Sequence, residues 1–268
     1  MRGTVLSAFC AITLGGGWTG AIAMEVEVPV IIAHRGASAE APENTAAAIK
    51  LALEQGARVI EFDVRETSDG VLALFHDEDF ERFGGTSDRV ESKTWAELCE
   101  MDVGSWFDPK YSDECAPTLE QAIRLCLEGG AIPLIERKSG SAENYASLIQ
   151  ELGVVDEVIV QAFDWEFLKE TRKLIPELRI GALGKRSFGR TDRAELRLLK
   201  PDWVGWKDAD FTESGLQFCK DMGCRVAIWT VNDRGRAELW LSRSADGIIT
   251  DRPADMLALL AERDNPDR

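Results

Sequence analysis

The amino-acid sequence lacks the features that mark membrane-spanning and nucleic-acid-binding proteins. Its apolar run near the N-terminus, residues 5–14, has about half of the ~20 residues that a membrane-spanning helix needs. The net charge is −16, and no cluster of lysine and arginine interrupts it. Nucleic acids and anionic membrane surfaces are bound through such basic clusters. We therefore expect no nucleic-acid partner and no stable membrane insertion, while the oligomeric state stays open.

Cysteine is also scarce, and its number argues against a disulfide framework. The sequence has six cysteines, of which five remain if residues 1–23 are removed. An odd number cannot pair completely, so we interpret most of them as small apolar core residues.

Residues 1–23 resemble a secretory signal peptide. Arg2 is followed by the apolar run and then by the cleavage-type motif Ala21-Ile22-Ala23. This pattern predicts a periplasmic or secreted protein. If Met24 is the true start, the protein is cytoplasmic instead, and the sequence leaves this alternative open.

Histidine occurs only twice, and both positions indicate chemistry. His34 ends the apolar part of IIAHRG (31–36), and His76 ends that of LALFHD (72–77). Histidine is the side chain whose unperturbed pKa lies nearest neutrality, so two histidines at the ends of expected strands suit general acid and base catalysis. The alternative is that both are ordinary buried histidines.

Three acidic residues lie on other apolar runs. Glu61 and Asp63 are two residues apart in VIEFDVR (59–65), so both carboxylates lie on one face of the expected strand. Glu136 closes the apolar part of AIPLIERK (131–138). Such buried carboxylates repel each other unless a cation or a proton lies between them. Because the set contains only oxygen donors, we predict a divalent-cation site for Mg²⁺ or Ca²⁺.

Basic and aromatic residues near these runs are candidates for substrate binding. In a chain this acidic, an anionic substrate must be bound locally, and we assign this role to Arg35 and Lys138 together with the metal. Trp229, in AIWTVN, forms either an apolar wall of the substrate site or part of the core.

Two residues of the PENT motif (42–45) have a supporting role in this interpretation. Glu43 is either a partner of the metal or of Arg35, or an acid favoured by the dipole of the following helix. Asn44 either hydrogen-bonds His34 or the substrate, or caps that helix, for which Thr45 is the other candidate.

Short apolar runs alternate with helical patterns, which predicts an α/β fold with a TIM-type (β/α)8 barrel. We expect a single catalytic barrel domain over residues 24–268. The expected strands are 30–33, 58–64, 71–75, 131–136, 158–163, 178–183, 202–206, 225–229 and 246–249, and the expected helices are 45–55, 118–128, 143–152, 165–175, 191–199, 213–222, 233–243 and 253–262.

This list has one strand more than an eight-stranded barrel requires. Only a turn around Asp69-Gly70 connects the strands at 58–64 and 71–75, which is too short for a crossover helix. Either the barrel is irregular near strands 2–3, or one expected strand is spurious. Residues 77–116 show no clear strand, and we interpret them as a small insertion after the second histidine that borders the site.

Several short motifs occur in a fixed order: HRG (34–36), PENT (42–45), ExD (61–63), TSDG (67–70), HD (76–77), GSWF (104–107), PTLEQAI (117–123), IERK (135–138), VAIWTVN (226–232) and DGIITDRP (246–253). In order and spacing they resemble the bacterial glycerophosphodiester phosphodiesterases over about residues 30–257. The resemblance implies metal-dependent hydrolysis of a small glycerophosphodiester to sn-glycerol 3-phosphate and an alcohol. It also implies that His34 deprotonates a glycerol hydroxyl and His76 protonates the leaving alcohol, by way of a cyclic phosphate. Which histidine is the base does not follow from the residues themselves.

Two other functions stay open at this point. A lysophospholipase D or phosphoinositide-phospholipase type of enzyme would use the same site on a lipid phosphodiester and would need an exposed apolar rim. The strongest candidates for such a rim are Trp106-Phe107 and Trp203–Trp206. A catalytically inactive barrel that serves as a binding module is disfavoured, because both histidines and all three acids are present.

Overall fold

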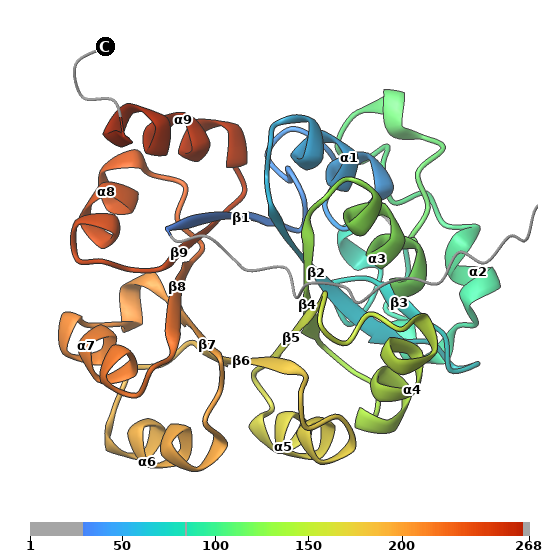
Figure 1. Cartoon of the computed structure of the whole chain (residues 1–268). Helices are drawn as coiled ribbons and strands as arrows, with labels where there is room; N and C mark the ends of the chain where they lie inside the picture. Colours follow the sequence, from blue (N-terminus) through green and yellow to red (C-terminus); the bar gives the residue numbers. More distant parts are fainter. Residues whose placement is uncertain (1–28, 84, 265–268) are drawn as a thin grey trace, which may run out of the picture.

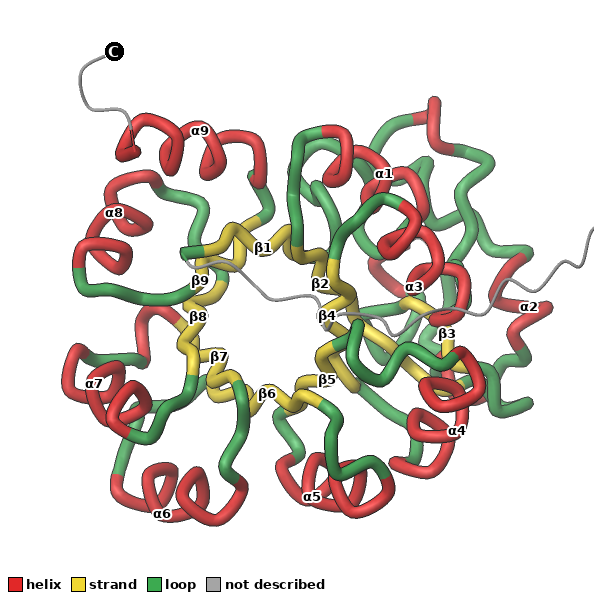
Figure 2. The backbone as a smooth tube through the Cα atoms, in the orientation of Figure 1, coloured by secondary structure: helices red, strands yellow, loops and turns green. Residues whose placement is uncertain are grey.

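The computed structural model describes residues 29–83 and 85–264, so the expected signal peptide or alternative start within residues 1–24 lies outside the described residues. Within them, eight parallel strands close into a barrel with helices on its outside (Figures 1 and 2). The pairing of β1 with both β2 and β9 closes the barrel, which confirms the predicted fold. The barrel strands are β1 (Val30–His34), β2 (Val59–Glu66), β4 (Ile132–Arg137), β5 (Ile159–Ala162), β6 (Arg179–Gly184), β7 (Trp203–Lys207), β8 (Arg225–Trp229) and β9 (Gly247–Thr250).

The helices cover the barrel because their apolar faces are buried against it. In α3, for example, the residues that share the buried face are Leu119, Ala122, Ile123 and Cys126. Thr118 caps this helix and forms a reciprocal capping box with Gln121. The helices around the barrel are α1 (Ala46–Glu54), α3 (Leu119–Glu128), α4 (Ala142–Leu152), α5 (Trp165–Leu174), α6 (Arg190–Leu199), α7 (Glu213–Asp221), α8 (Arg234–Ser242) and α9 (Pro253–Asp264).

The ninth expected strand is real but lies outside the barrel. β3 (Leu72–Leu74) pairs antiparallel with the end of β2, with Val64 opposite Leu74. The backbone N–H of Thr67 donates to the carbonyl of Val71 and closes the tight turn between them. This hairpin is the irregularity that was expected near strands 2–3, and it carries His76 back toward the barrel mouth.

The expected insertion follows β3 and contains only short elements. They are η1 (Glu81–Phe83), η2 (Val90–Ser92), α2 (Trp95–Cys99) and η3 (Pro109–Tyr111), and a further short turn, η4 (Asp208–Asp210), follows β7. The insertion has a small apolar core of its own, in which Phe75, Phe80, Val90 and Leu98 are buried. Because Phe75 immediately precedes His76, this core supports the segment that carries the second histidine.

The structure limits the apolar surface that was considered for a lipid substrate. Trp203 and Trp206 are buried, with 7% and 0% of their surface exposed, so they form no rim. Trp106 is 41% exposed and packs edge-on against Phe107. No helix within the described residues combines the length and the apolar character that crossing a membrane requires.

The cysteines fall into two groups. Cys126, Cys219 and Cys224 are buried, as expected for apolar core residues. Cys99 and Cys115 are half-buried in the insertion, and their sulfur atoms lie 3.1 Å apart as free thiols.

Candidate active site

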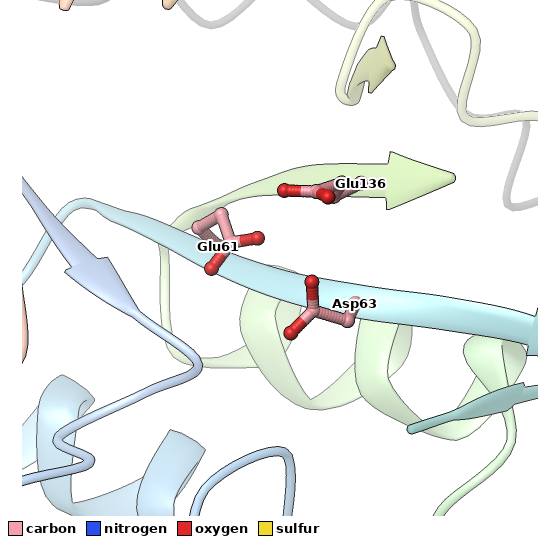
Figure 3. Close-up of side chains that lie close together, drawn as sticks. All are labelled: Glu61, Asp63 and Glu136. Atoms are coloured by element: carbon pink, nitrogen blue, oxygen red, sulfur yellow. The ribbon is translucent and has the colours of Figure 1, made fainter. Parts of the chain in front are cut away.

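Parallel pairing brings the predicted acids together at the carboxyl end of the barrel. His34 lies opposite Glu61 in the register of β1 and β2, and Asp63 lies opposite Glu136 in that of β2 and β4. One carboxylate oxygen from each acid lies within 4.8 Å of the others (Figure 3). In this fold, the carboxyl ends of the barrel strands are where catalytic residues gather.

The three carboxylates are buried close together, and burial and neighbouring charges shift the pKa of each. Burial and the neighbouring charges of Asp63 and Glu136 raise the pKa of Glu61 well above its usual value. Burial and the charge of Asp63 also raise the pKa of Glu136. Burial acts on Asp63 in the same direction, but the positive charges of Arg35 and Lys138 outweigh it and lower its pKa.

The two carboxylate oxygens of Glu61 differ in their hydrogen bonding. Oε2 of Glu61 accepts a hydrogen bond from the backbone N–H of Arg35 at 3.0 Å, whereas the buried Oε1 has no hydrogen-bond partner. A buried carboxylate oxygen without a donor is costly unless a cation fills the place. Three oxygen donors with one of them unsatisfied therefore fit a hard divalent cation such as Mg²⁺ or Ca²⁺.

Arg35 and Lys138 border the acidic cluster. Nε of Arg35 lies 3.0 Å from Oδ2 of Asp63, and Nζ of Lys138 lies 2.8 Å from Oε1 of Glu136 and 3.4 Å from Oδ1 of Asp63. Burial lowers the pKa of Lys138, but the carboxylates of Asp63 and Glu136 outweigh this effect and raise it. Both side chains are therefore fixed as cations at the edge of the acidic cluster.

The PENT motif supports the site in a way that only partly matches the expectations. Glu43 pairs with Arg35 at 2.9 Å, as one alternative predicted. Asn44 neither caps α1 nor bonds His34: Thr45 is the cap, and Asn44 holds Asp63 instead. The amide of Asn44 donates to Oδ2 of Asp63 and accepts from its backbone N–H, both at 3.0 Å. The φ of +57° at Asn44, a conformation that asparagine tolerates, permits this arrangement.

His34 has a partner that the sequence reasoning missed. Its Nδ1 lies 2.6 Å from Oδ1 of Asp251, which directly follows β9. Burial raises the pKa of Asp251, but hydrogen bonds from His34, Asn232 and Ser38 outweigh it and lower the pKa to about 2. Because Nδ1 donates to Asp251, Nε2 of His34 is the atom that can exchange a proton with a substrate.

His76 is held in the same way by its neighbour in the chain. Its Nδ1 lies 2.6 Å from Oδ1 of Asp77, and Arg82 bonds the other oxygen of Asp77 at 2.6 Å. Arg82 also bonds Glu43, which links the insertion to the PENT segment. Each histidine thus has its own carboxylate at Nδ1, and within residues 29–83 and 85–264 neither Nε2 forms a hydrogen bond.

One cavity of about 220 Å³ connects these groups. Trp229 lines it and packs edge-on against Phe163, with the ring centres 5.6 Å apart, so it belongs to the cavity wall. The sequence reasoning assigned no role to Gln161, Lys185 or Lys207. The structure adds all three to the lining of this cavity, which also includes His34, Arg35, Glu61, His76, Glu136 and Lys138.

Comparison with known proteins agrees with this geometry. Residues 34–255 match the model of the glycerophosphoryl diester phosphodiesterase family. The chain is 32% identical to a glycerophosphodiester phosphodiesterase of Caldanaerobacter subterraneus subsp. tengcongensis over 241 residues, which are 86% of this chain and 97% of that protein.

Solved structures give the same result. A phosphodiesterase of Oleispira antarctica, in complex with the product sn-glycerol-3-phosphate, superposes with a TM-score of 0.81 at 27% identity, covering 87% of this chain and 97% of that one. A glycerophosphodiester phosphodiesterase of Agrobacterium tumefaciens gives 0.72 at 29% identity, covering 84% and 97%. With its barrel, its acidic cluster and its paired histidines, the chain belongs to the glycerophosphoryl diester phosphodiesterase family.

Proposed function

We propose that the protein hydrolyses glycerophosphodiesters to sn-glycerol 3-phosphate and an alcohol, with the help of a divalent cation. The observation that carries this proposal is one cavity that is lined by two acids of the cluster, Glu61 and Glu136, and by the two carboxylate-paired histidines. The relative from Oleispira antarctica, whose structure contains sn-glycerol-3-phosphate, supports the assignment of the product.

The three carboxylates would hold Mg²⁺ or Ca²⁺, and the unpartnered Oε1 of Glu61 would be one of its ligands. When bound, such a cation polarises a phosphoryl oxygen and neutralises charge in the transition state. Asn44 keeps Asp63 in place through its two hydrogen bonds, and Lys138 does the same for Glu136.

Arg35 and Lys138 would bind the phosphate directly. Both are cations at the wall of the cavity, and both already face carboxylates, so their charges are oriented before the substrate arrives. Fixed cations of this kind stabilise the additional negative charge that the phosphoryl group acquires in the transition state. Trp229 and Phe163 would give the substrate, at its glycerol or its leaving alcohol, an apolar wall.

The histidines would move the protons. Following the family resemblance, Nε2 of His34 takes the proton of the glycerol hydroxyl as that oxygen attacks phosphorus and a cyclic phosphate forms. Nε2 of His76 gives a proton to the departing alcohol, and the roles reverse when water opens the ring. Asp251 and Asp77 keep Nδ1 of each ring protonated, so that Nε2 stays available.

Release of glycerol 3-phosphate from glycerophosphocholine and glycerophosphoethanolamine tests the proposal. We expect turnover that chelator abolishes and Mg²⁺ or Ca²⁺ restores, and a loss of about 10²- to 10⁴-fold in His34→Ala and in His76→Ala. A matched control is Arg124→Ala, which removes an exposed i,i+4 ion pair on α3 away from the cavity. A folded, metal-loaded protein that cleaves only acylated substrates would refute the proposal in favour of a lipid-acting enzyme.

A further inference from the structure

Two lysines line the cavity on strands that do not carry the acidic cluster. Lys185 directly follows β6 and Lys207 is the last residue of β7, and both line the cavity that contains Arg35 and Lys138. In the closed barrel, β6 and β7 lie opposite β1 and β2 (Figure 2). A substrate whose phosphate lies at Arg35 and Lys138 therefore extends toward the two lysines if it crosses the barrel mouth.

The alternation of the strands fixes the direction of both side chains. Trp206 precedes Lys207 and packs on the outside of the barrel, with its ring centre 4.9 Å from that of Phe188. Gly184 precedes Lys185, and a Cβ there would lie 2.2 Å from the ring of Trp206, so it faces the same outer layer. Because successive residues of a strand point to opposite faces, Lys185 and Lys207 point toward the barrel mouth.

Neither lysine is neutralised by a neighbour. Across residues 29–83 and 85–264, no carboxylate forms an ion pair with Lys185 or Lys207; Asp208, which follows Lys207, is paired with Arg236 instead. Nζ of Lys185 lies 5.1 Å from the ring centre of Phe163, on the aromatic wall of the cavity. Both lysine side chains are exposed and free to follow a ligand.

The two lysines differ from the other cations that line the cavity. Arg35 contacts the carboxylates of Asp63 and Glu43, and Lys138 contacts those of Asp63 and Glu136. Lys185 and Lys207 have no such carboxylate partner in the described residues, although the net charge of the chain is −16. The phosphate is assigned to Arg35 and Lys138, and the glycerol portion of the substrate carries no charge, so an anionic partner for these lysines would belong to the alcohol.

We propose that Lys185 and Lys207 form a subsite for an anionic group on the alcohol portion of the substrate. The enzyme then prefers glycerophosphodiesters whose alcohol carries a carboxylate or a phosphate over those with a neutral or purely cationic alcohol. This inference rests on the proposed function, because it concerns the selectivity of the same site.

Two substrates that differ by a single carboxylate test the subsite. Glycerophosphoserine carries this group and glycerophosphoethanolamine lacks it, so the ratio of their kcat/KM values isolates its effect. We expect the wild type to favour the serine compound severalfold, and Lys185→Gln and Lys207→Gln each to reduce the ratio about two- to fivefold, as for a solvent-exposed ion pair. The conservative variant Lys185→Arg keeps the ratio, and added salt lowers it because the contact is exposed.

Lys173→Gln is the matched control. Lys173 lies near the end of α5, outside the cavity lining, and its replacement changes the net charge by the same amount. Its ratio stays at the wild-type value. A ratio near one in the wild type, or a preference that both Gln variants retain, overturns the subsite while turnover of both compounds still supports the hydrolase.

If neither compound is hydrolysed, the proposed function fails, and equilibrium binding then decides the subsite. The ratio of the two dissociation constants, measured by calorimetry in the presence of Mg²⁺, replaces the kinetic ratio. A preference for the serine compound that falls in both Gln variants supports the subsite, and equal binding of the two compounds overturns it.

Discussion

Replacing Asp251 by asparagine is expected to slow turnover, because it conflicts with the hydrogen bonds that orient His34. Oδ1 of Asp251 lies 2.6 Å from Nδ1 of His34, and Oδ2 accepts a hydrogen bond from the amide of Asn232 at 2.5 Å. An asparagine has one oxygen and one NH₂ group, so it can satisfy only one of these donors. Its NH₂ group faces either the NH₂ group of Asn232 or Nδ1 of His34, and the second arrangement leaves the proton of the imidazole on the wrong nitrogen.

Asn232 cannot relieve the conflict by turning its amide. Its Oδ1 accepts hydrogen bonds from Oγ1 of Thr250 and from the backbone N–H of Asp251, both at 2.9 Å. The expected loss is therefore that of a hydrogen bond to a charged group, about 1.5–3 kcal/mol. At about 1.4 kcal/mol per factor of ten, this corresponds to a loss of roughly 10- to 150-fold in kcat/KM.

The assay is release of glycerol 3-phosphate over a range of pH, with Asp255→Asn as the control. Asp255 lies in the first turn of α9 and is exposed, and its ion-pair partner Arg252 lies 3.7 Å away. This control should keep wild-type kinetics. Asp251→Asn with kcat/KM within threefold of the wild type at every pH would refute the reasoning.

A double replacement makes the test sharper. In Asp251→Asn with Asn232→Asp, the new carboxylate at 232 can accept from the NH₂ group at 251, which leaves the amide oxygen at 251 to accept from His34. The carboxylate also keeps its hydrogen bonds from Thr250 and from the backbone of residue 251. We expect the double variant to be more active than Asp251→Asn alone; equal or lower activity in a folded protein would show that the donor pattern is not the cause.

The same site predicts a pH dependence of stability. The pKa of Asp251 is about 2 in the folded protein, below the value of about 3.9 expected for an unfolded aspartate. Its contribution is therefore complete above about pH 4 and is lost as the pH falls toward 2. Allowing for a side chain that is 31% exposed, it amounts to about 1–2 kcal/mol. Because pH 3 lies between the two pKa values, about half of this contribution is lost between pH 6 and pH 3. Urea unfolding at these two pH values should therefore show a pH-dependent loss that is smaller in Asp251→Asn by about 0.5–1 kcal/mol; a loss as large as that of the wild type would contradict the assignment.

Three further changes test the cation site and the packing beneath it. Glu61→Gln removes one of the buried carboxylates, so Mg²⁺ or Ca²⁺ should raise the melting temperature of the wild type but not that of the variant; an equal rise in both would argue against Glu61 as a ligand. Asn44→Ala leaves the buried N–H of Asp63 without its partner and should lower the free energy of unfolding by about 1–3 kcal/mol in urea, and a loss under about 0.5 kcal/mol would count against that bond. Gly184→Ala places a Cβ 2.2 Å from the ring of Trp206 and should lower the free energy of unfolding by about 1–3 kcal/mol in the same assay. Unchanged stability would mean that Trp206 and its neighbours can move to make room for the added methyl group.

The sequence was sufficient for the barrel because its strands are buried on both faces and are separated by amphipathic helices. Each expected barrel strand has a counterpart in the structure. The additional expected strand, β3, follows β2 after only a turn, and it therefore pairs antiparallel with β2 outside the barrel. The acidic cluster was predictable for a related reason. Glu61 and Asp63 share a strand face, and Glu136 closes the run that becomes the neighbouring strand, so parallel pairing alone brings them together.

The missed residues depend on contacts that no local pattern shows. Asp251 reaches His34 only because β9 closes the barrel against β1, with Ala33 opposite Thr250. A signal was available, since Asp251 directly follows the apolar run of the DGIITDRP motif, as His34 ends its own run. The hydrogen bonds between Asn44 and Asp63 were not predicted, because they depend on a left-handed backbone at Asn44 that turns its side chain toward Asp63.

The closure of β1 against β9 also joins residues that are made at very different times during synthesis of the chain. His34 emerges from the ribosome early, whereas Asp251 and β9 emerge more than 200 residues later, since 217 positions separate the two residues. Until then, β1 lacks one of its neighbours and His34 lacks the carboxylate that orients it. Closing so long a stretch of chain costs conformational entropy, so contacts of this kind slow folding. A nascent or C-terminally truncated chain that ends before β9 thus contains both histidines and all three acids but lacks the carboxylate that orients His34.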